Sequence, residues 1–502
     1  MTRSAKAVMV LGCTSDAGKS WLATALCRWY ARQGLTVRPY KAQNMSNHAR
    51  VVPLHDGAPG ELGEIGSAQY FQALAAGCAP DVRMNPILLK PEADTRSQVL
   101  VRGRVDPALT TLPWRERSAR LWPLARAALH ALRDEAELLV IEGAGSPAEI
   151  NLAANDYVNT FTAIEAQARC LLVADIDRGG AFAHLHGTTA LMDAQVRTQL
   201  AGYVLNKFRG DARLLSPAPE MLEAATGVPT LAVIPMRRGH GLPEEDAVPA
   251  DARGAHGLPA QRRVVILATP HASNLDEFEP LARCGLALRW VRSTADLREA
   301  LADSHWLVLP GSKHTRADLA WVRAQTGMAE AIRAHVAAQR PLLAVCGALQ
   351  WLGAVVDDPQ GLEGGTAGSA AGLGLLPLHT RYAPHKGLSR AAHRLGRLDG
   401  PWAPLSDLAV DGYEIHLGQT RPLASGDEQP AEPLRPAFAG RGDLGWQQGP
   451  VLAVYLHGLF ENPAVLQALF GRAVPPLDRV FDDLADLLDA SFRPGALMGL
   501  LR

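Results

Sequence analysis

The chain has 502 residues, of which 47% are hydrophobic, and its 50 basic and 51 acidic side chains give a formal net charge of -1. A near-neutral chain of this length excludes a strongly basic nucleic-acid-binding protein, so we expect no nucleic acid among the partners. No apolar run reaches the roughly 20 residues that a membrane helix needs, so no membrane span is predicted. These properties favour an enzyme with two or three domains.

The start of the chain and the cysteines indicate the compartment. Residues 1–6 are short and polar and lead directly into AVMVL (7–11), which leaves no room for a signal peptide. Six cysteines are scattered without paired spacing, which argues against a disulfide framework and against a zinc site. We therefore expect a cytoplasmic protein.

Short apolar runs that end in small or polar residues recur along the first half of the chain. They are AVMVL (7–11), LLVIEGAG (138–145), CLLVADIDRGG (170–180), GYVLNKFRGD (202–211) and LAVIP (231–235). Segments with helical spacing, such as 20–33, lie between several of them. Buried strands that alternate with helices predict a doubly wound parallel sheet, in which functional groups gather beyond the carboxyl ends of the strands.

A change of composition divides the chain. We predict a first domain over 1–237, a linker rich in Gly, Pro and charge over 238–262, a second α/β domain over 263–470 and a helical tail over 471–502. The strands expected in the second domain are VVILAT (264–269), WLVLPGS (306–312), LLAVC (342–346) and VLAVYLHG (451–458).

The segment VLGCTSDAGKSWL (10–22) places a glycine-containing loop between the first strand and the first helix. Backbone N–H groups of such a loop can hold phosphate oxygens, while Lys19 reaches the outer phosphates and the Ser20 hydroxyl binds Mg²⁺. Five residues separate Gly12 from Gly18, one more than in the strict pattern, which is typical of the dethiobiotin synthetase and partition ATPase branch of P-loop proteins. The candidate nucleotide-binding residues here are Gly12, Thr14, Asp16, Gly18, Lys19 and Ser20. The alternative interpretation is a glycine turn that only caps a helix.

Other polar residues end the following strands. Glu142 is a candidate Mg²⁺ ligand together with Ser20, because a second carboxylate is needed near the metal or its waters. Asp175 and Asp177 could serve metal or substrate, or could be solvated acids at a strand end. Asn206 lies where related P-loop enzymes hold the adenine, although a turn-forming Asn explains it equally well.

The second domain contains PLLAVCGALQWLG (341–353), in which an apolar strand ends on Cys346 and a helix begins at once. A sharp turn of this kind exposes the side chain above the sheet, and the N-terminus of the following helix favours a thiolate. The alternative is a buried structural cysteine. We predict that Cys346 is a nucleophile.

Acyl transfer by a thiolate needs a base and an oxyanion hole. His457 in VYLHGLF is the candidate base, and the N–H of Gly347 with a backbone N–H of the turn 310–312 could bind the oxyanion. His416 competes for the role of the base, and Glu414 could orient either imidazole.

Eleven ordered segments that cover nearly the whole chain resemble the cobyric acid synthase family, the glutamine-dependent amidases of cobalamin biosynthesis. They are TSDAGKS (14–20), KAQNMS (41–46), GEIGSAQ (63–69), MNPILLKP (84–91), EGAGSPAEINL (142–152), DIDRGG (175–180), NKFRGD (206–211), LPGSKHT (309–315), VCGALQ (345–350), GYEIHLG (412–418) and YLHGLF (455–460). The resemblance implies an N-terminal P-loop domain of the dethiobiotin synthetase type and a C-terminal class I, triad-type glutamine amidotransferase domain.

The same resemblance implies the reaction. ATP with Mg²⁺ would activate the b, d, e and g carboxylates of the corrinoid adenosylcobyrinic acid a,c-diamide as acyl phosphates, and ammonia from glutamine would amidate them to give adenosylcobyric acid. Cys346 and His457 would be the catalytic residues of glutamine hydrolysis, and Asn206 would contact the nucleotide.

Two positions depart from common patterns. Ala348 follows Gly347 where a second glycine is more usual, and Leu459 stands two residues after His457 where many triad amidotransferases have Glu. The third member of the triad, the oligomeric state and the order of the amidations are therefore not predicted. The rival functions are cobyrinic acid a,c-diamide synthase, a P-loop switch of the partition or septum-site type, and a binding protein without chemistry.

Overall fold

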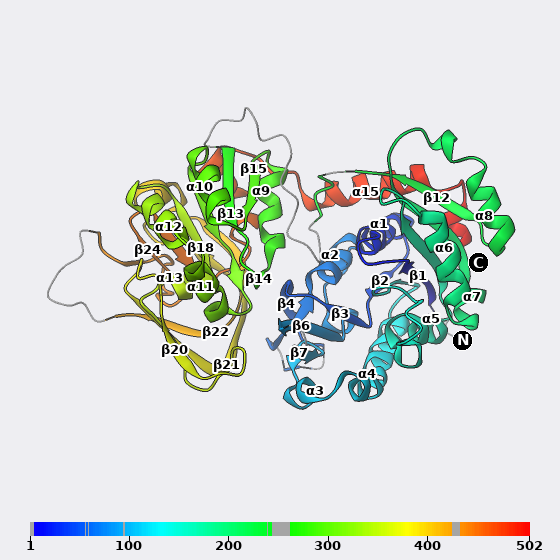
Figure 1. The fold of residues 1–502 in the computed structure, drawn as a ribbon, viewed down its shortest axis with the longest axis horizontal. Helices are drawn as coiled ribbons and strands as arrows, with labels where there is room; N and C mark the ends of the chain where they lie inside the picture. The colour runs from blue at the N-terminus through cyan, green and yellow to red at the C-terminus, as the bar shows by residue number, and fades with distance from the viewer. Residues whose placement is uncertain are drawn as a thin grey trace. The chain divides into compact units, whose positions relative to one another are not determined.

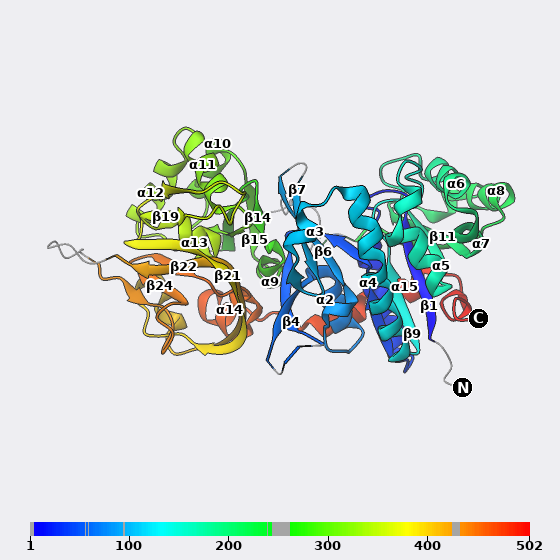
Figure 2. The same cartoon turned by 90° about the horizontal axis from the view of Figure 1, so that it is seen from below.

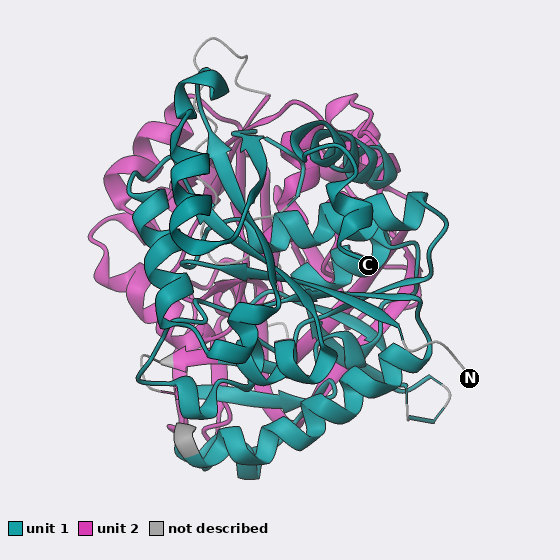
Figure 3. Ribbon diagram, turned by 90° about the vertical axis from the view of Figure 1, so that its right-hand side faces the viewer, with its two compact units in different colours: residues 1–90, 97–246, 476–502 teal, residues 91–96, 247–475 magenta. Residues whose placement is uncertain are grey.

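The computed structural model describes residues 5–55, 57–58, 60–93, 96–237, 239–242, 262–423 and 432–502. Most of the predicted linker, residues 243–261, lies outside this range. The chain divides into two compact units (Figure 3). Unit 1 comprises residues 1–90, 97–246 and 476–502, and unit 2 comprises residues 91–96 and 247–475.

Unit 1 is built on a six-stranded parallel sheet in the order β12-β11-β10-β1-β9-β2 (Figure 1). These strands are β1 Lys6–Gly12, β2 Val37–Tyr40, β9 Leu138–Glu142, β10 Arg169–Asp175, β11 Leu200–Phe208 and β12 Thr230–Pro235. Strands β2 and β9 lie on one side of β1 in the sheet, whereas the later strands β10, β11 and β12 lie in succession on its other side. The strand order therefore reverses at β1, and ligands bind at such a point in doubly wound sheets.

Helices surround this sheet and bury apolar faces against it. Helix α1 Lys19–Arg32 packs against β1, β2 and β9, and helix α4 Trp114–Asp134 packs against β2 and β9 (Figure 2). The buried positions Leu121, Ala125, Ala128, Leu129 and Leu132 follow the spacing of one helix face. The other helices are α2 Ser67–Ala75, α3 Pro107–Thr111, α5 Thr162–Ala166, α6 Ala181–Leu191, α7 Ala194–Thr198, α8 Ala218–Thr226, α15 Leu477–Ser491 and α16 Ala496–Gly499.

Two small sheets complete unit 1. One has the order β3-β6-β7-β8, and the other is a β4-β5 hairpin. Their strands are β3 Gln43–Met45, β4 Ala49–Pro53, β5 Leu62–Gly66, β6 Ile87–Ala93, β7 Arg96–Val101 and β8 Arg104–Val105.

The C-terminal segment returns to unit 1, where α15 packs on α1. Its buried residues Val480, Phe481, Leu484, Ala485 and Leu488 form one face. Acidic residues flank that face and contact α1: Arg28 pairs with Asp478 and Asp482, and the Trp29 indole donates to Asp489. The residues expected as a helical tail thus include a helix that packs directly on the helix after the P-loop.

Unit 2 contains a seven-stranded sheet in the order β15-β13-β16-β18-β25-β24-β23. Its first five strands are parallel, and β24 and β23 are antiparallel. The strands are β13 Arg263–Leu267, β15 Ala287–Val291, β16 Trp306–Leu309, β18 Leu342–Val345, β23 Arg435–Pro436, β24 Gly445–Gln448 and β25 Val451–Val454. The helices are α9 Glu279–Arg283, α10 Thr294–Ala302, α11 Thr315–Ala324, α12 Met328–Ala337, α13 Gly347–Leu352 and α14 Pro463–Phe470.

A second sheet of unit 2 has the order β20-β19-β21-β22, and β14 pairs with β17 in a short antiparallel ribbon. Their bounds are β14 Ala272–Ser273, β17 Gly311–Ser312, β19 Val355–Asp358, β20 Gly368–Ala371, β21 Leu378–Arg394 and β22 Ala409–Pro422. The predicted α/β fold class is confirmed for both units, and every strand named from the sequence corresponds to a strand of the two large sheets.

Candidate active sites

The P-loop follows β1 and leads into α1, as predicted. Gly18 has φ 95°, and a Cβ atom there would lie 2.1 Å from the Asn206 Nδ2 atom. A Cβ on Gly12 would lie 2.9 Å from the Lys19 Nζ atom. Both glycines are therefore required by the close approach of another side chain, and Gly18 also by its left-handed backbone.

Lys19 crosses the space enclosed by the loop. Its Nζ donates to the carbonyl oxygen of Thr14 at 3.1 Å and to that of Gly145 at 3.3 Å. Gly145 lies in the loop after β9, so the ammonium group joins two loops at the carboxyl edge of the sheet. Asn159 fixes this second loop, because its Oδ1 accepts from the Ala144 N–H and its Nδ2 donates to the Ala144 carbonyl.

Glu142 is buried at the end of β9, and its carboxylate accepts hydrogen bonds from three side chains. Its Oε1 accepts from the Ser20 hydroxyl at 2.8 Å and pairs with Lys41 at 2.8 Å. Its Oε2 accepts from Gln72 Nε2 at 2.5 Å. The Gln72 Oε1 atom is buried and has no hydrogen-bond partner among the described residues. Sequence reasoning found Ser20 and Glu142 but missed Lys41 and Gln72.

Mg²⁺ prefers oxygen ligands such as hydroxyl, carboxylate and carbonyl groups. The Ser20 hydroxyl and the Glu142 carboxylate supply two of these kinds, and the unpartnered Gln72 oxygen supplies a third near the same carboxylate. The chemistry of this donor set fits a magnesium ion.

Asn206 and Asp16 take part in contacts that hold the loop. Asn206 donates from Nδ2 to the Ala17 carbonyl at 2.9 Å. Lys207 donates to the Asp16 carbonyl at 2.6 Å, and the Asp16 carboxylate pairs with Arg178 at 3.3 Å. The carboxyl end of β11 therefore holds the backbone of the P-loop directly.

Asp175 and Asp177 pair with basic side chains. Asp175 is buried and pairs with Lys207 at 3.1 Å and with Arg178 at 3.4 Å. Asp177 pairs with Arg209. These contacts favour a role in tying together the loops after β10 and β11 rather than in metal binding.

Cys346 occupies the turn between β18 and α13. Its backbone has φ 50° and ψ -105°, a conformation that a non-glycine residue adopts only at a cost of about 1–3 kcal/mol. The surrounding structure enforces it, because the Cys346 N–H donates to the Val454 carbonyl at 2.7 Å. The thiol is buried, with 6% of the residue exposed, and lies 3.6 Å from the Ile415 carbonyl oxygen.

His457 is the imidazole beside this thiol. It interacts electrostatically with Cys346 and forms a hydrogen bond through Nδ1 with Glu277 Oε1 at 2.8 Å. The second oxygen of Glu277 accepts from the Gly458 N–H at 2.9 Å. The Tyr413 ring stacks on the imidazole with centroids 5.2 Å apart.

The electrostatics of His457 follow from these neighbours. Burial disfavours the imidazolium, but the Glu277 carboxylate and the interaction with Cys346 outweigh it and raise the pKa of His457 to about 10. An imidazolium beside a cysteine favours the thiolate, which is the nucleophilic form of that side chain.

Glu277 completes a Cys–His–Glu series that sequence reasoning left open. It lies in a short 3-10 helix, Leu275–Phe278, that follows Asn274 with φ 55°. The rival pair is separate: His416 bonds Glu414 at 3.2 Å and the Gly418 carbonyl at 2.8 Å, and its ring stacks on Tyr455. No local sequence pattern identifies Glu277 as the third member of the triad. The sequence shows only that Glu277 is an acidic residue that follows β13.

The turn 310–312 lies against both members of the thiol pair. A Cβ atom on Gly347 would lie 2.9 Å from the Ser312 nitrogen, and one on Gly311 would lie 3.1 Å from His457 Cε1. The Ser312 nitrogen therefore lies close to Gly347, the residue after Cys346, and the oxyanion hole formed by this turn and Gly347 stays a prediction.

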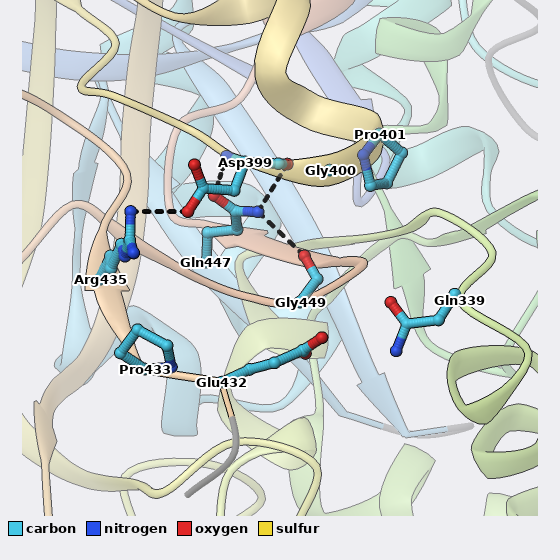
Figure 4. A pocket seen from close by; sticks show the side chains of 9 residues that line it. All are labelled: Gln339, Asp399, Gly400, Pro401, Glu432, Pro433, Arg435, Gln447 and Gly449. Carbon is cyan, nitrogen blue, oxygen red and sulfur yellow. Dashed lines mark hydrogen bonds and ion pairs between the residues drawn. The ribbon is translucent and has the colours of Figure 1, made fainter.

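A separate cavity of about 190 Å³ lies elsewhere in unit 2 (Figure 4). Gln339 precedes β18 and Gly449 precedes β25, so this cavity is at the amino end of strands whose carboxyl ends lead to Cys346 and His457. Its polar groups bond one another: Asp399 pairs with Arg435 at 2.6 Å, and Gln447 donates to two carbonyl oxygens. It is not part of the thiol site.

Comparisons with known proteins agree with the two units. Residues 8–246 match the family described as CobQ/CobB/MinD/ParA nucleotide binding domain, and residues 263–465 match the CobB/CobQ-like glutamine amidotransferase domain. The chain is 58% identical to a cobyric acid synthase of Methylibium petroleiphilum over 100% of this chain and 98% of that protein. It is also 58% identical to one of Leptothrix cholodnii over 99% and 97%.

A P-loop nucleotide-binding unit joined to a glutamine amidotransferase unit defines a glutamine-hydrolysing amidoligase. The chain belongs to the cobyric acid synthase family, whose activity is glutamine-dependent amidation in cobalamin biosynthesis. Among the described residues, no helix has both the length and the apolar character needed to cross a membrane.

Proposed function

We propose that the protein amidates the b, d, e and g carboxylates of adenosylcobyrinic acid a,c-diamide, using ATP and the ammonia released from glutamine, to give adenosylcobyric acid. The observation that carries the proposal is His457, which bonds Glu277 and interacts with Cys346, in the same chain as a P-loop. The similarity to cobyric acid synthases over the full length supports the substrate. The reaction takes place in the cytoplasm, where the six free thiols remain reduced.

In unit 2, Cys346 has passed its proton to His457, and the resulting thiolate attacks the side-chain amide carbon of glutamine. His457 donates its proton to the departing ammonia, and Glu277 keeps the imidazole oriented and stabilises its charged form. The N–H of Gly347 and one N–H of the turn 310–312 bind the oxyanion. His457 then accepts a proton from the water that hydrolyses the thioester and releases glutamate.

In unit 1, the P-loop binds ATP. Lys19 exchanges its carbonyl partners for the outer phosphates, and the backbone from Gly12 through Thr14 and Asp16 to Gly18 lines the phosphates. Asn206 holds this backbone and contacts the base. Ser20 and Glu142 hold Mg²⁺, which neutralises charge on the phosphates when bound.

Chemistry links the two units. Phosphorylation of a corrin carboxylate makes an acyl phosphate with a good leaving group, and ammonia then displaces the phosphate to form the amide. Lys19 stabilises the negative charge of the transferring group. Neither unit alone can use glutamine nitrogen for amidation.

The test is mass spectrometry of adenosylcobyrinic acid a,c-diamide after incubation with ATP, Mg²⁺ and a nitrogen source. The wild type should perform four successive amidations with glutamine. Cys346→Ala should lose amidation with glutamine and retain it with ammonium, whereas Lys19→Met should lose it with both sources. Absence of any amidation by the wild type with either source would refute the proposed substrate.

A further inference from the structure

A fully buried carboxylate, Asp318, lies in the first turn of α11 and accepts hydrogen bonds from two loops. Its Oδ2 accepts from the Ser312 hydroxyl at 2.6 Å and from the Thr269 hydroxyl at 2.7 Å. Its Oδ1 accepts from the His271 backbone N–H at 3.0 Å and bonds the His271 ring nitrogen Nδ1 at 2.8 Å. Asp318 is 0% exposed, so all four contacts are shielded from water.

These partners come from loops that follow neighbouring parallel strands. Thr269 and His271 follow β13, and Ser312 follows β16, which pairs with β13. The same two loops also pair through their backbones, since β14 pairs with β17 and the Lys313 N–H donates to the His271 carbonyl at 2.9 Å. Asp318 is the side chain that joins them at this edge of the sheet.

Four hydrogen-bonding groups surround the side chain of Asp318. A carboxylate offers about four acceptor sites, and here two hydroxyl groups, one N–H and one imidazole occupy them. The hydrogen bond with Asp318 raises the pKa of the His271 imidazole. A buried polar group is costly unless it is hydrogen-bonded, so loss of this carboxylate would leave several buried donors without their acceptor.

The segment that Asp318 fixes is the wall of the thiol site. Ser312 approaches Gly347 so closely that a Cβ on Gly347 would lie 2.7 Å from the Ser312 Cβ, and Gly311 approaches His457. A shift of this turn by a few tenths of an ångström would displace its N–H groups from the oxyanion without moving the thiol itself. Oxyanion donors are effective only at hydrogen-bonding distance from the developing charge.

We propose that Asp318 is a positioning residue for glutamine hydrolysis: it holds the turn 310–312 so that a backbone N–H completes the oxyanion hole with Gly347. This inference rests on the proposed function of Cys346 as the nucleophile. Asp318 does not contact glutamine and acts through the Ser312 hydroxyl and the loop that contains His271.

The experiment compares Asp318→Asn with a matched control, Ser304→Ala. Ser304 is buried before the amino end of β16, where its hydroxyl bonds the Arg263 carbonyl and the Trp306 N–H, so its loss weakens the same strand at the opposite end. Each full-length variant is assayed for glutamine hydrolysis, for alkylation of Cys346 by iodoacetamide, and for amidation with ammonium. Iodoacetamide needs the thiolate but forms no oxyanion, which separates the two requirements.

For Asp318→Asn we expect kcat for glutamine hydrolysis to fall about 100-fold, with KM within about threefold of the wild type. Cys346 alkylation and ammonium-dependent amidation should be unchanged. Ser304→Ala should retain all three rates. A parallel loss of alkylation, or a rise in KM with kcat unchanged, would overturn the proposal, since Asp318 would then support the thiol pair or glutamine binding.

Ser312→Ala keeps the test decisive if Asp318→Asn does not fold. It removes the hydroxyl that joins the turn to Asp318 and that also accepts from the His314 N–H, and it should lower kcat about tenfold without affecting alkylation. An unchanged kcat in Ser312→Ala would overturn the proposal. Cys346→Ala serves as the separate check: glutamine hydrolysis that persists in this variant would refute the proposed function of Cys346 rather than the role of Asp318.

Discussion

The two candidate sites differ in how far their functional groups are already arranged for chemistry. In unit 2, His457 bonds Glu277 and interacts electrostatically with Cys346, so the three side chains follow the order in which a proton would move. In unit 1, Lys19 and Glu142 bond groups of the protein itself: Lys19 contacts two backbone carbonyls, and Glu142 pairs with Lys41.

This difference indicates which ligands can bind only after side chains of the protein rearrange. Glutamine can react at the thiol site without any change in the hydrogen bonds of the three catalytic side chains. Nucleotide and Mg²⁺ must instead displace internal partners of Lys19 and Glu142, and this displacement reduces the net binding energy. We infer that unit 2 is preorganised, whereas unit 1 is rearranged when its ligands bind.

We expect the largest effect on glutamine hydrolysis from a substitution of Glu277, the third member of the triad. Glu277→Gln should lower kcat for glutamine hydrolysis by about 10³- to 10⁴-fold, because His457 loses both its orientation and the carboxylate that stabilises the imidazolium. Amidation with ammonium should be unaffected. The measurement is steady-state glutamine hydrolysis, with ammonium-dependent amidation assayed in parallel.

The matched control for this variant is Glu414→Gln, which removes the partner of the rival His416. We expect hydrolysis within about threefold of the wild type in the control. A larger loss in Glu414→Gln than in Glu277→Gln would show that the geometry has been assigned to the wrong histidine.

The triad also shows what the sequence could and could not predict. Cys346, His457 and Glu142 were predictable because each ends or follows an apolar strand, and parallel strands collect such residues at one edge. Glu277 was not, since it lies 180 residues from His457 in a short turn without periodicity. Lys41 and Gln72 were missed for the same reason: their shared partner Glu142 is distant in sequence.

The sequence also did not predict which helices pack against each other. The spacing of apolar residues predicts a C-terminal helix, but amphipathicity does not say which surface covers it. Only the structure shows that α15 packs on α1, where Asp482 meets Arg28. Local sequence patterns therefore predict the fold class, whereas contacts between segments distant in sequence are seen only in the structure.

The ion pair between Lys41 and Glu142 in unit 1 predicts a second effect, on stability. Lys41→Met leaves the buried Glu142 carboxylate without its cation, which should reduce the free energy of unfolding of unit 1 by about 3–5 kcal/mol. Mg²⁺ should restore part of this loss by binding the same carboxylate. The measurement is chemical denaturation with and without Mg²⁺.

A control for this prediction is Arg83→Met, which breaks another largely buried pair, with Asp81 and Glu135, outside the cluster around Glu142. Mg²⁺ should not stabilise this variant more than it stabilises the wild type. Equal rescue of both variants by Mg²⁺ would argue against Glu142 as a metal ligand.

The preorganised site predicts a pH dependence of stability. The pKa of His457 is raised from 6.5 to about 10, so the folded protein retains a proton that the unfolded chain releases between these values. The stabilisation is fully present below pH 6.5 and is lost as pH rises towards 10. Glu277→Gln removes the charge that raises this pKa, so its unfolding free energy should vary less across the window. Denaturation curves at a series of pH values measure the difference, and identical slopes for the two proteins would contradict it.

The smallest expected effect concerns the two residues after the nucleophile. Ala348 is fully buried in the first turn of α13, so Ala348→Gly should cost about 1 kcal/mol of stability through lost helix propensity and packing, with glutamine hydrolysis retained. Gly347→Ala provides the contrast, because its new Cβ would lie 2.7 Å from the Ser312 Cβ and push the turn away from the oxyanion. Thermal unfolding together with glutaminase assays distinguishes the two variants. Retained hydrolysis in Gly347→Ala would mean that the turn can move without loss, and the thiol site would then be less preorganised than its hydrogen bonds indicate.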